Sequence, residues 1–231
     1  MNSKYILLTS SFIAIVIAAL ASIIPIGLYN QAEVSSMLPT LFTPATITFS
    51  IWSIIYLSWI AIWVYEALWK SWITRENVYL LASAQILSSL WLIPSQSLWI
   101  GTSLIVMMWV LYLLLILFYN SRLEPLVFRW VSDLFLWWIL IAFLANVHLI
   151  LVSYNIYFIP LYLTVISILV WLLVNIYFVK IHRSYIPPIV LVWALFWIII
   201  AQQEIITQIV ATLSILTIVL ISLQCLFIRK K

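Results

Sequence analysis

Five aromatic residues at helical spacing are the part of this sequence best suited to binding a ligand. Phe49, Trp52, Tyr56, Trp59 and Trp63 follow one another at intervals of three, four, three and four residues. At about 100° per residue, they fall within about 80° of one another on a helix. Such a stripe either packs against other helices and lipid, or forms one wall of a pocket, since aromatic faces favour stacked rings.

Side chains that would support other chemistry are scarce. The two glycines, Gly27 and Gly101, exclude Gly-rich phosphate loops, and the single Cys225 excludes internal disulfides and cysteine-based zinc sites. The sequence shows no Ser-His-Asp set and no cluster of metal ligands. We therefore expect a non-enzymatic protein with no catalytic residues, no metal and no required cofactor.

The elements that position the stripe are apolar helices. Of the 231 residues, 67% are hydrophobic and 7% are charged, whereas a soluble domain carries roughly a quarter charged residues. The composition predicts an all-α, multi-pass integral membrane protein. Eight apolar stretches predict a bundle of eight transmembrane helices, the third ending at Pro94 and the seventh being short: 5–24, 46–69, 78–93, 98–119, 131–153, 159–179, 187–201 and 205–228.

The basic residues predict how these spans are oriented. All ten Lys and Arg residues fall at span ends on one side of the membrane, and positive residues are retained on the cytoplasmic side. Both termini are therefore expected in the cytoplasm, and topology explains the net charge of +4 without a nucleic-acid partner. The host membrane is either a bacterial-type plasma membrane or an organellar membrane.

Most of the acidic residues have basic neighbours close in sequence. Glu66 with Lys70 and Arg129 with Asp133 are four residues apart, as in helical ion pairs. Only Glu33 and Glu204 fall on the outer side, either as solvated loop acids or as part of a polar mouth. No Lys, Arg, Asp or Glu lies in the middle of a span, which argues against an ion-coupled carrier.

The helix that carries the stripe has a predicted beginning. Thr43 is suited to cap it, and Pro44 fits the first turn, where a missing N–H costs nothing.

Short segments along the spans also form a recognisable series. They are F-T-P-A-T-I-T-F-S-I-W at 42–52, Gln85 with Ser88 and Trp91, Trp138 with Ala142 and Asn146, and V-L-V-W-A-L at 190–195. In this order they resemble the TspO/MBR family, the tryptophan-rich sensory proteins, and most closely a longer branch with extra C-terminal helices. The chain departs from the family at Ser88, where asparagine is usual.

The resemblance implies a domain division and a site. Residues 1–153 would form the five-helix transmembrane bundle of the family, and 154–231 would add three C-terminal helices. The family binds porphyrins and other flat hydrophobic molecules in a pocket roofed by the loop after the first helix. Carried over by position, the ligand-binding residues would be Pro44, Trp52, Ser88, Trp91, Trp138, Ala142 and Asn146.

His148 invites comparison with a haem ligand. Two residues rotate it about 200° from Asn146, off the stripe that Trp138, Ala142 and Asn146 share. We therefore expect a packed or interfacial histidine, with axial ligation as the alternative.

The leading prediction is a ligand-binding membrane protein with a sensory or regulatory role. Its expected partners are membrane lipid and a hydrophobic small molecule, either a tetrapyrrole or a lipid. The sequence leaves two alternatives open, an accessory or scaffold subunit of a larger membrane complex and a small-molecule or lipid transporter. A homodimer also remains open.

Overall fold

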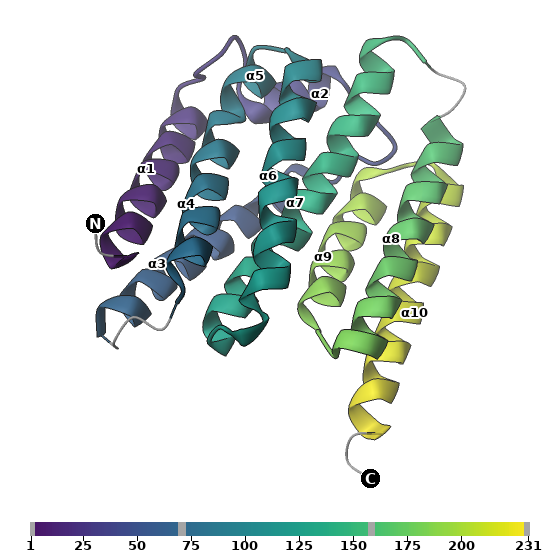
Figure 1. Ribbon diagram of the computed structural model, residues 1–231. Coiled ribbons are helices and arrows are strands. Elements are labelled where there is room, and N and C mark those ends of the chain that lie inside the picture. The colour runs from purple at the N-terminus through teal and green to yellow at the C-terminus, as the bar shows by residue number, and fades with distance from the viewer. Residues whose placement is uncertain (1–2, 69–72, 157–159, 229–231) are drawn as a thin grey trace. The chain divides into compact units, whose positions relative to one another are not determined.

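The computed structural model describes residues 3–68, 73–156 and 160–228 (Figure 1). In these ranges all regular structure is helical. The helices are α1 (Ser3–Ile23), α2 (Gln31–Met37), η1 (Thr46–Ser50), α3 (Ile51–Leu68), α4 (Arg75–Leu90), α5 (Leu92–Gln96), α6 (Ile100–Asn120), η2 (Ser121–Leu123), α7 (Leu126–Ser153), α8 (Pro160–His182), α9 (Ile186–Ala201) and α10 (Ile205–Ile228).

The chain divides into two compact units. The N-terminal unit comprises Met1–Met37 and Ser50–Asn146, and the C-terminal unit comprises Leu38–Phe49 and Val147–Lys231. Helix α7 therefore contributes residues to both units. The predicted domain boundary at residue 153 is not tested by this division and stays a prediction.

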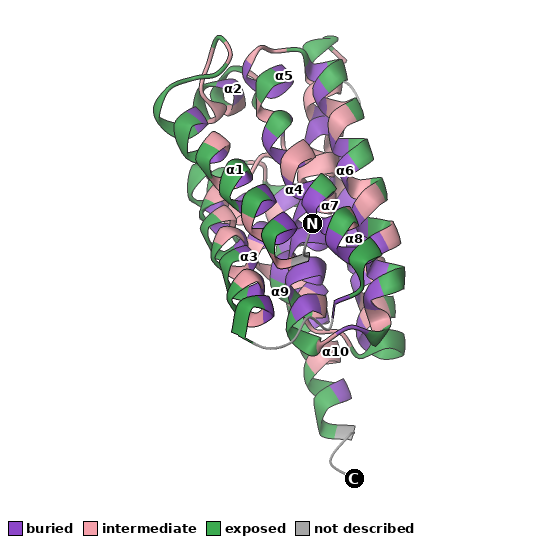
Figure 2. Ribbon diagram, turned by 60° about the vertical axis from the view of Figure 1, so that its left-hand side comes forward, coloured by how far each residue is buried: buried purple, intermediate pink, exposed green. Residues whose placement is uncertain are grey.

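Seven helical stretches of the described residues are long and apolar enough to cross a membrane, with η1 and α3 forming one (Thr46–Leu68) and α4 and α5 another (Arg75–Gln96). Helix α9 is a shorter apolar helix of 16 residues. Among the seven, the stretch through α4 and α5 has the largest buried share and α10 the smallest (Figure 2). Their exposed surfaces carry many large apolar side chains, among them Phe12, Trp109 and Leu173. Water would not solvate so much apolar surface, so a multi-pass membrane protein is the class that fits.

In the N-terminal unit, α1 packs against α3 and α4, and α4 packs against α6 (Figure 1). The α1–α4 interface is built on small and polar residues. Ser10 Oγ donates to Gln85 Oε1 at 2.6 Å, and Gln85 Nε2 donates to Ser11 Oγ at 3.1 Å. Ala14 is fully buried there. Small residues allow the close approach of helices that lipid itself does not drive together.

The turn after α1 approaches the end of α5 closely. The backbone N–H groups of Leu28 and Tyr29 donate to the Gln96 carbonyl at 2.9 and 3.0 Å. The Gln96 side chain accepts from the Ile26 N–H at 2.8 Å and donates to the Ala21 carbonyl at 3.1 Å. Gln96 is almost fully buried, so it ties the end of α1 to α5.

Pro94 does not end the third span as predicted. After Trp91 the chain continues as α5, and Pro94 is the third residue of that helix. The N–H groups of a first helical turn have no partner within the helix, so the N–H group that proline lacks costs no hydrogen bond there.

Thr43 was also assigned wrongly as a helix cap. Its hydroxyl accepts from the Thr40 N–H at 3.2 Å and bonds with the Thr40 hydroxyl at 2.8 Å. The hydroxyl therefore closes a turn over residues 40–43, and helical structure begins later, at Thr46 in η1.

In the C-terminal unit, α10 packs against both α8 and α9 (Figure 1). These helices also hold the segment Leu38–Phe49. Gln202 Nε2 donates to the carbonyls of Thr40 and Thr43 at 3.1 and 2.7 Å. The Trp193 indole donates to the Thr48 carbonyl at 3.2 Å. The last helices thus fix the backbone of the segment that leads into α3.

Candidate ligand-binding site

The aromatic stripe of α3 faces α7 within the N-terminal unit. Trp52 lies edge-on to Trp138 with ring centroids 6.4 Å apart, and 6.1 Å from Phe135. About two turns further along α3, Trp59 lies edge-on to Phe135 at 5.0 Å. Tyr56 lies between Trp52 and Trp59, with its ring centroid 5.6 Å from that of Trp52 and 5.3 Å from that of Trp59. The predicted helical stripe is confirmed for these three residues of α3.

The members of this aromatic cluster differ in burial. Trp59 and Trp138 are 1% and 2% exposed, whereas Trp52 and Tyr56 are half-buried. The Trp138 Nε1 atom is buried and has no hydrogen-bond partner. A buried N–H without a partner is costly, and the oxygen of a bound molecule could satisfy it. The cluster therefore combines accessible aromatic surface with a donor that the protein leaves unused.

A second group of predicted residues is joined by hydrogen bonds. The Trp91 indole donates to Ser103 Oγ at 2.6 Å, and Ser103 Oγ donates to Asn146 Oδ1 at 2.8 Å. Asn146 Nδ2 in turn donates to the Ala142 carbonyl at 2.8 Å. Trp91, Ser103 and Asn146 are all buried. This polar chain links α4, α6 and α7 and leaves Asn146 with a fixed orientation.

The other two predicted residues take different places. Ser88 is buried, and its hydroxyl donates to the Gln85 carbonyl at 2.8 Å, within its own helix. Pro44 belongs to the C-terminal unit, in the segment held by Gln202. The cluster of the N-terminal unit thus contains Trp52 and Trp138, and the polar chain contains Trp91, Ala142 and Asn146.

Two residues of the site were missing from the prediction. Phe135 precedes Trp138 by one helical turn, so the three-residue spacing was a usable signal. Ser103 has no such signal, because a lone serine in an apolar helix is compatible with any face. Its position between Trp91 and Asn146 depends on the packing of three helices.

His148 is a packed side chain, as expected. Its ring stacks on Phe42 with centroids 4.8 Å apart and 11° between the planes. Its Nε2 atom lies 3.2 Å from Ser167 Oγ. Within the described ranges, no group of three or more His, Cys, Asp or Glu side chains is arranged to hold a metal ion.

Glu33 and Glu204 cap helices in their separate units. Glu33 accepts from the Asn30 N–H at 2.7 Å while Asn30 accepts from the Glu33 N–H at 3.0 Å. Glu204 accepts from the N–H groups of Thr207 and Ile206 at 2.6 and 3.1 Å. The Thr207 N–H above all holds the pKa of the Glu204 carboxyl below its ordinary value. Each carboxylate therefore has a local structural role.

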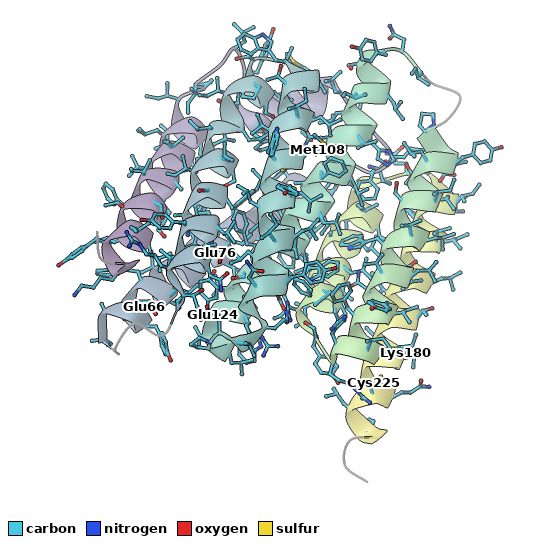
Figure 3. The ribbon with its side chains drawn as sticks, viewed as in Figure 1. Glu66, Glu76, Met108, Glu124, Lys180 and Cys225 are labelled. Carbon is cyan, nitrogen blue, oxygen red and sulfur yellow. The ribbon has the colours of Figure 1, made fainter. Side chains whose placement is uncertain are left out.

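The remaining acids of the N-terminal unit lie at one end of it, where Figure 3 shows Glu66, Glu76 and Glu124. Asp133 forms an ion pair with Arg122, at 2.9 Å, whereas the helical spacing predicted a pair with Arg129. Glu124 accepts from Asn77 Nδ2 at 2.7 Å and from the Thr74 N–H at 2.9 Å. The predicted partner of Glu66, Lys70, lies outside the described residues.

Comparison with known proteins adds one match. No curated protein and no solved structure matches the chain. The family model for TSPO-like proteins matches residues 4–227, a range that includes the aromatic cluster, the polar chain and all the helices after residue 153. Because the match covers nearly the whole chain, this membrane protein belongs to the TSPO-like family.

Proposed function

We propose that the protein binds a flat hydrophobic ligand of the porphyrin type at the aromatic cluster, in a sensory or regulatory role rather than a catalytic one. The observation that carries the proposal is the pairing of Trp52 with Trp138 across α3 and α7, with ring centroids 6.4 Å apart and 90° between the planes. Trp52 is half-buried and can stack with an added ring.

The unpartnered indole N–H of Trp138 supports the same site. A porphyrin carries carboxylates or carbonyls at its edge, and a charged or polar oxygen is the partner that this donor lacks. The polar chain through Ser103 fixes the neighbouring turns of α7, because Asn146 lies two turns beyond Trp138 on the same face. Membership of the TSPO-like family supports ligand binding rather than catalysis. The pocket roofed by the loop after the first helix stays a prediction.

The proposal is tested by titrating protoporphyrin into the purified protein and following tryptophan fluorescence. Trp52→Ala and Trp138→Ala should each weaken saturable quenching about tenfold, the effect of losing roughly 1.4 kcal/mol of ring contact. Trp109→Ala is the matched control, since Trp109 is 55% exposed on α6 and pairs with Tyr112. Each curve is normalised to the initial signal of its own variant. Saturable quenching that both site variants retain at wild-type affinity would remove the proposed site.

We further propose eight membrane crossings with both termini in the cytoplasm. The charge pattern supports the count of eight, and this count requires that the short helix α9 crosses the membrane. Its 16 residues extend about 24 Å, less than the roughly 30 Å of a hydrocarbon core. Crossing therefore requires local thinning of the bilayer or a contribution from flanking residues.

Two positions that flank α9 provide the test. In a Cys225→Ser background, Gln203→Cys should react with a membrane-impermeant maleimide in intact cells. Ser184→Cys should react only after permeabilisation. Labelling of both cysteines from the same side would contradict the crossing by α9 and with it the count of eight.

A further inference from the structure

The C-terminal unit contains an apolar groove that the proposed ligand site does not use. The groove has a volume of about 470 Å³ and lies between α9 and α10. Ile189, Val192 and Phe196 line it from α9, and Val219, Ser222 and Leu223 line it from α10. The volume is within the roughly 300–1,000 Å³ of small-molecule sites.

The groove opens toward the lipid-facing surface of its unit. Ile189 and Phe196 are 62% and 49% exposed, and Leu223 is 44% exposed. Both helices are apolar, and α10 is long and apolar enough to cross the membrane. In a bilayer, the molecules that surround such side chains are lipid acyl chains. An acyl chain is also the ligand whose shape and polarity fit a long apolar groove.

One polar atom inside the groove lacks a partner. The Ser222 Oγ atom is buried and makes no hydrogen bond. A serine in a membrane helix usually bonds the carbonyl four residues earlier or a neighbouring helix. A lipid has carbonyl oxygens between its chains and its headgroup, and such an oxygen would accept a hydrogen bond from the Ser222 hydroxyl.

A cation is fixed at the end of the groove nearest Ser222. Arg183 Nη1 donates to the Cys225 carbonyl at 3.1 Å, and Cys225 follows Ser222 by about one helical turn. Arg183 is exposed, and its guanidinium has further N–H donors for an anion. Figure 3 shows Lys180 at the same end of the unit as Cys225.

No described carboxylate in this unit offsets that charge at the groove. Glu204 is the one acidic residue within 38–49 and 147–231, and it caps the opposite end of α10. The basic end of the groove is thus complementary to an anionic headgroup, and basic pockets beside membrane helices bind such headgroups.

We propose that the groove between α9 and α10 binds an anionic phospholipid of the surrounding membrane, with an acyl chain along Val192 and Val219 and the phosphate on Arg183. Arg183 is also the residue after α8, at a φ of 51°. Glycine is usual at that position, since other residues adopt the left-handed region at a cost. The Arg183 side chain reaches the Cys225 carbonyl, about one turn of α10 beyond Ser222. The proposal does not rest on ligand binding at the aromatic cluster.

The experiment measures lipid retention by native mass spectrometry of the full chain, released from micelles doped with phosphatidylglycerol or phosphatidylcholine. The wild type should retain phosphatidylglycerol preferentially. Arg183→Gln should lower its affinity for phosphatidylglycerol about tenfold, the loss of one charge-assisted contact, and leave phosphatidylcholine unchanged. Arg75→Gln is the matched control, because it removes one exposed positive charge from the other unit.

A second variant tests the groove itself with Arg183 in place. Val219→Trp fills the groove and should reduce retention of both lipids severalfold. Equal retention of the two lipids by the wild type, or wild-type retention by Arg183→Gln, would overturn the proposal. Displacement of the lipid by glycerol phosphate alone would show a phosphate site without a chain site and overturn it too. A dimer that Val219→Trp dissociates would assign the groove to a second copy instead.

Discussion

Gly27→Ala should destabilise the protein by about 3 kcal/mol or more, as measured by unfolding of the detergent-solubilised chain on addition of SDS. A Cβ atom at residue 27 would lie 2.5 Å from the Gln96 carbonyl carbon and 2.6 Å from its oxygen. Those are backbone atoms, which cannot rotate away, so the turn after α1 must separate from α5. Overpacking costs about 1–3 kcal/mol, and the bonds to Gln96 from Ile26, Leu28 and Tyr29 would weaken with it.

The second glycine of the chain provides the control. A Cβ atom at Gly101 would meet no atom within 4 Å. Gly101 lies in the first turn of α6, where alanine is the better helix former. Gly101→Ala should therefore change stability by no more than about 0.5 kcal/mol, in the stabilising direction. Equal stabilities for the two variants would mean that the turn does not approach α5 as closely as described.

Ser103→Ala should destabilise the protein by about 2 kcal/mol. It leaves the Trp91 indole N–H and the Asn146 Oδ1 atom without their partner in a buried region. Each unsatisfied group costs about 1–3 kcal/mol in soluble proteins, but hydrogen bonds between membrane helices average about 0.6 kcal/mol. Because one hydroxyl serves two partners, each cost counts twice. The expected loss of about 2 kcal/mol lies between the membrane value and the soluble value for the pair of groups. The same SDS titration measures the loss.

Ser132→Ala is the matched control for that prediction. Ser132 is as buried as Ser103, but its hydroxyl donates only to the Phe128 carbonyl of its own helix, at 2.8 Å. Removing such a bond is nearly neutral, because the carbonyl keeps its place in the helix. If the two serine variants lost the same stability, the polar chain would contribute no more than a local bond.

The parts of this structure that repeat along one helix could be predicted from the sequence. The stripe of Trp52, Tyr56 and Trp59 follows from helical periodicity, and the apolar stretches predicted most of the long helices to within a few residues. Trp138 and Asn146 were found through the resemblance, which also named the family correctly.

The parts that depend on contacts distant in sequence could not be predicted. Ser103 joins two helices through one hydroxyl, and nothing in its neighbours marks it. Thr43 has the right type for a helix cap, but Thr40 uses its hydroxyl for a turn instead. The bond from Gln202 to the Thr40 carbonyl spans 162 residues, so no local pattern indicates that the last helices hold the segment before α3.

That long-range attachment has a consequence for biosynthesis. The Thr48 carbonyl and the Trp193 indole are 145 residues apart. A ribosome adding about 5–20 residues per second needs roughly 7–30 s to cover that distance. The segment 38–49 is therefore made early and waits, without its final hydrogen bonds, while several membrane helices are synthesised after it. A chain arrested before residue 193 would carry that segment into the membrane without the partners that close it.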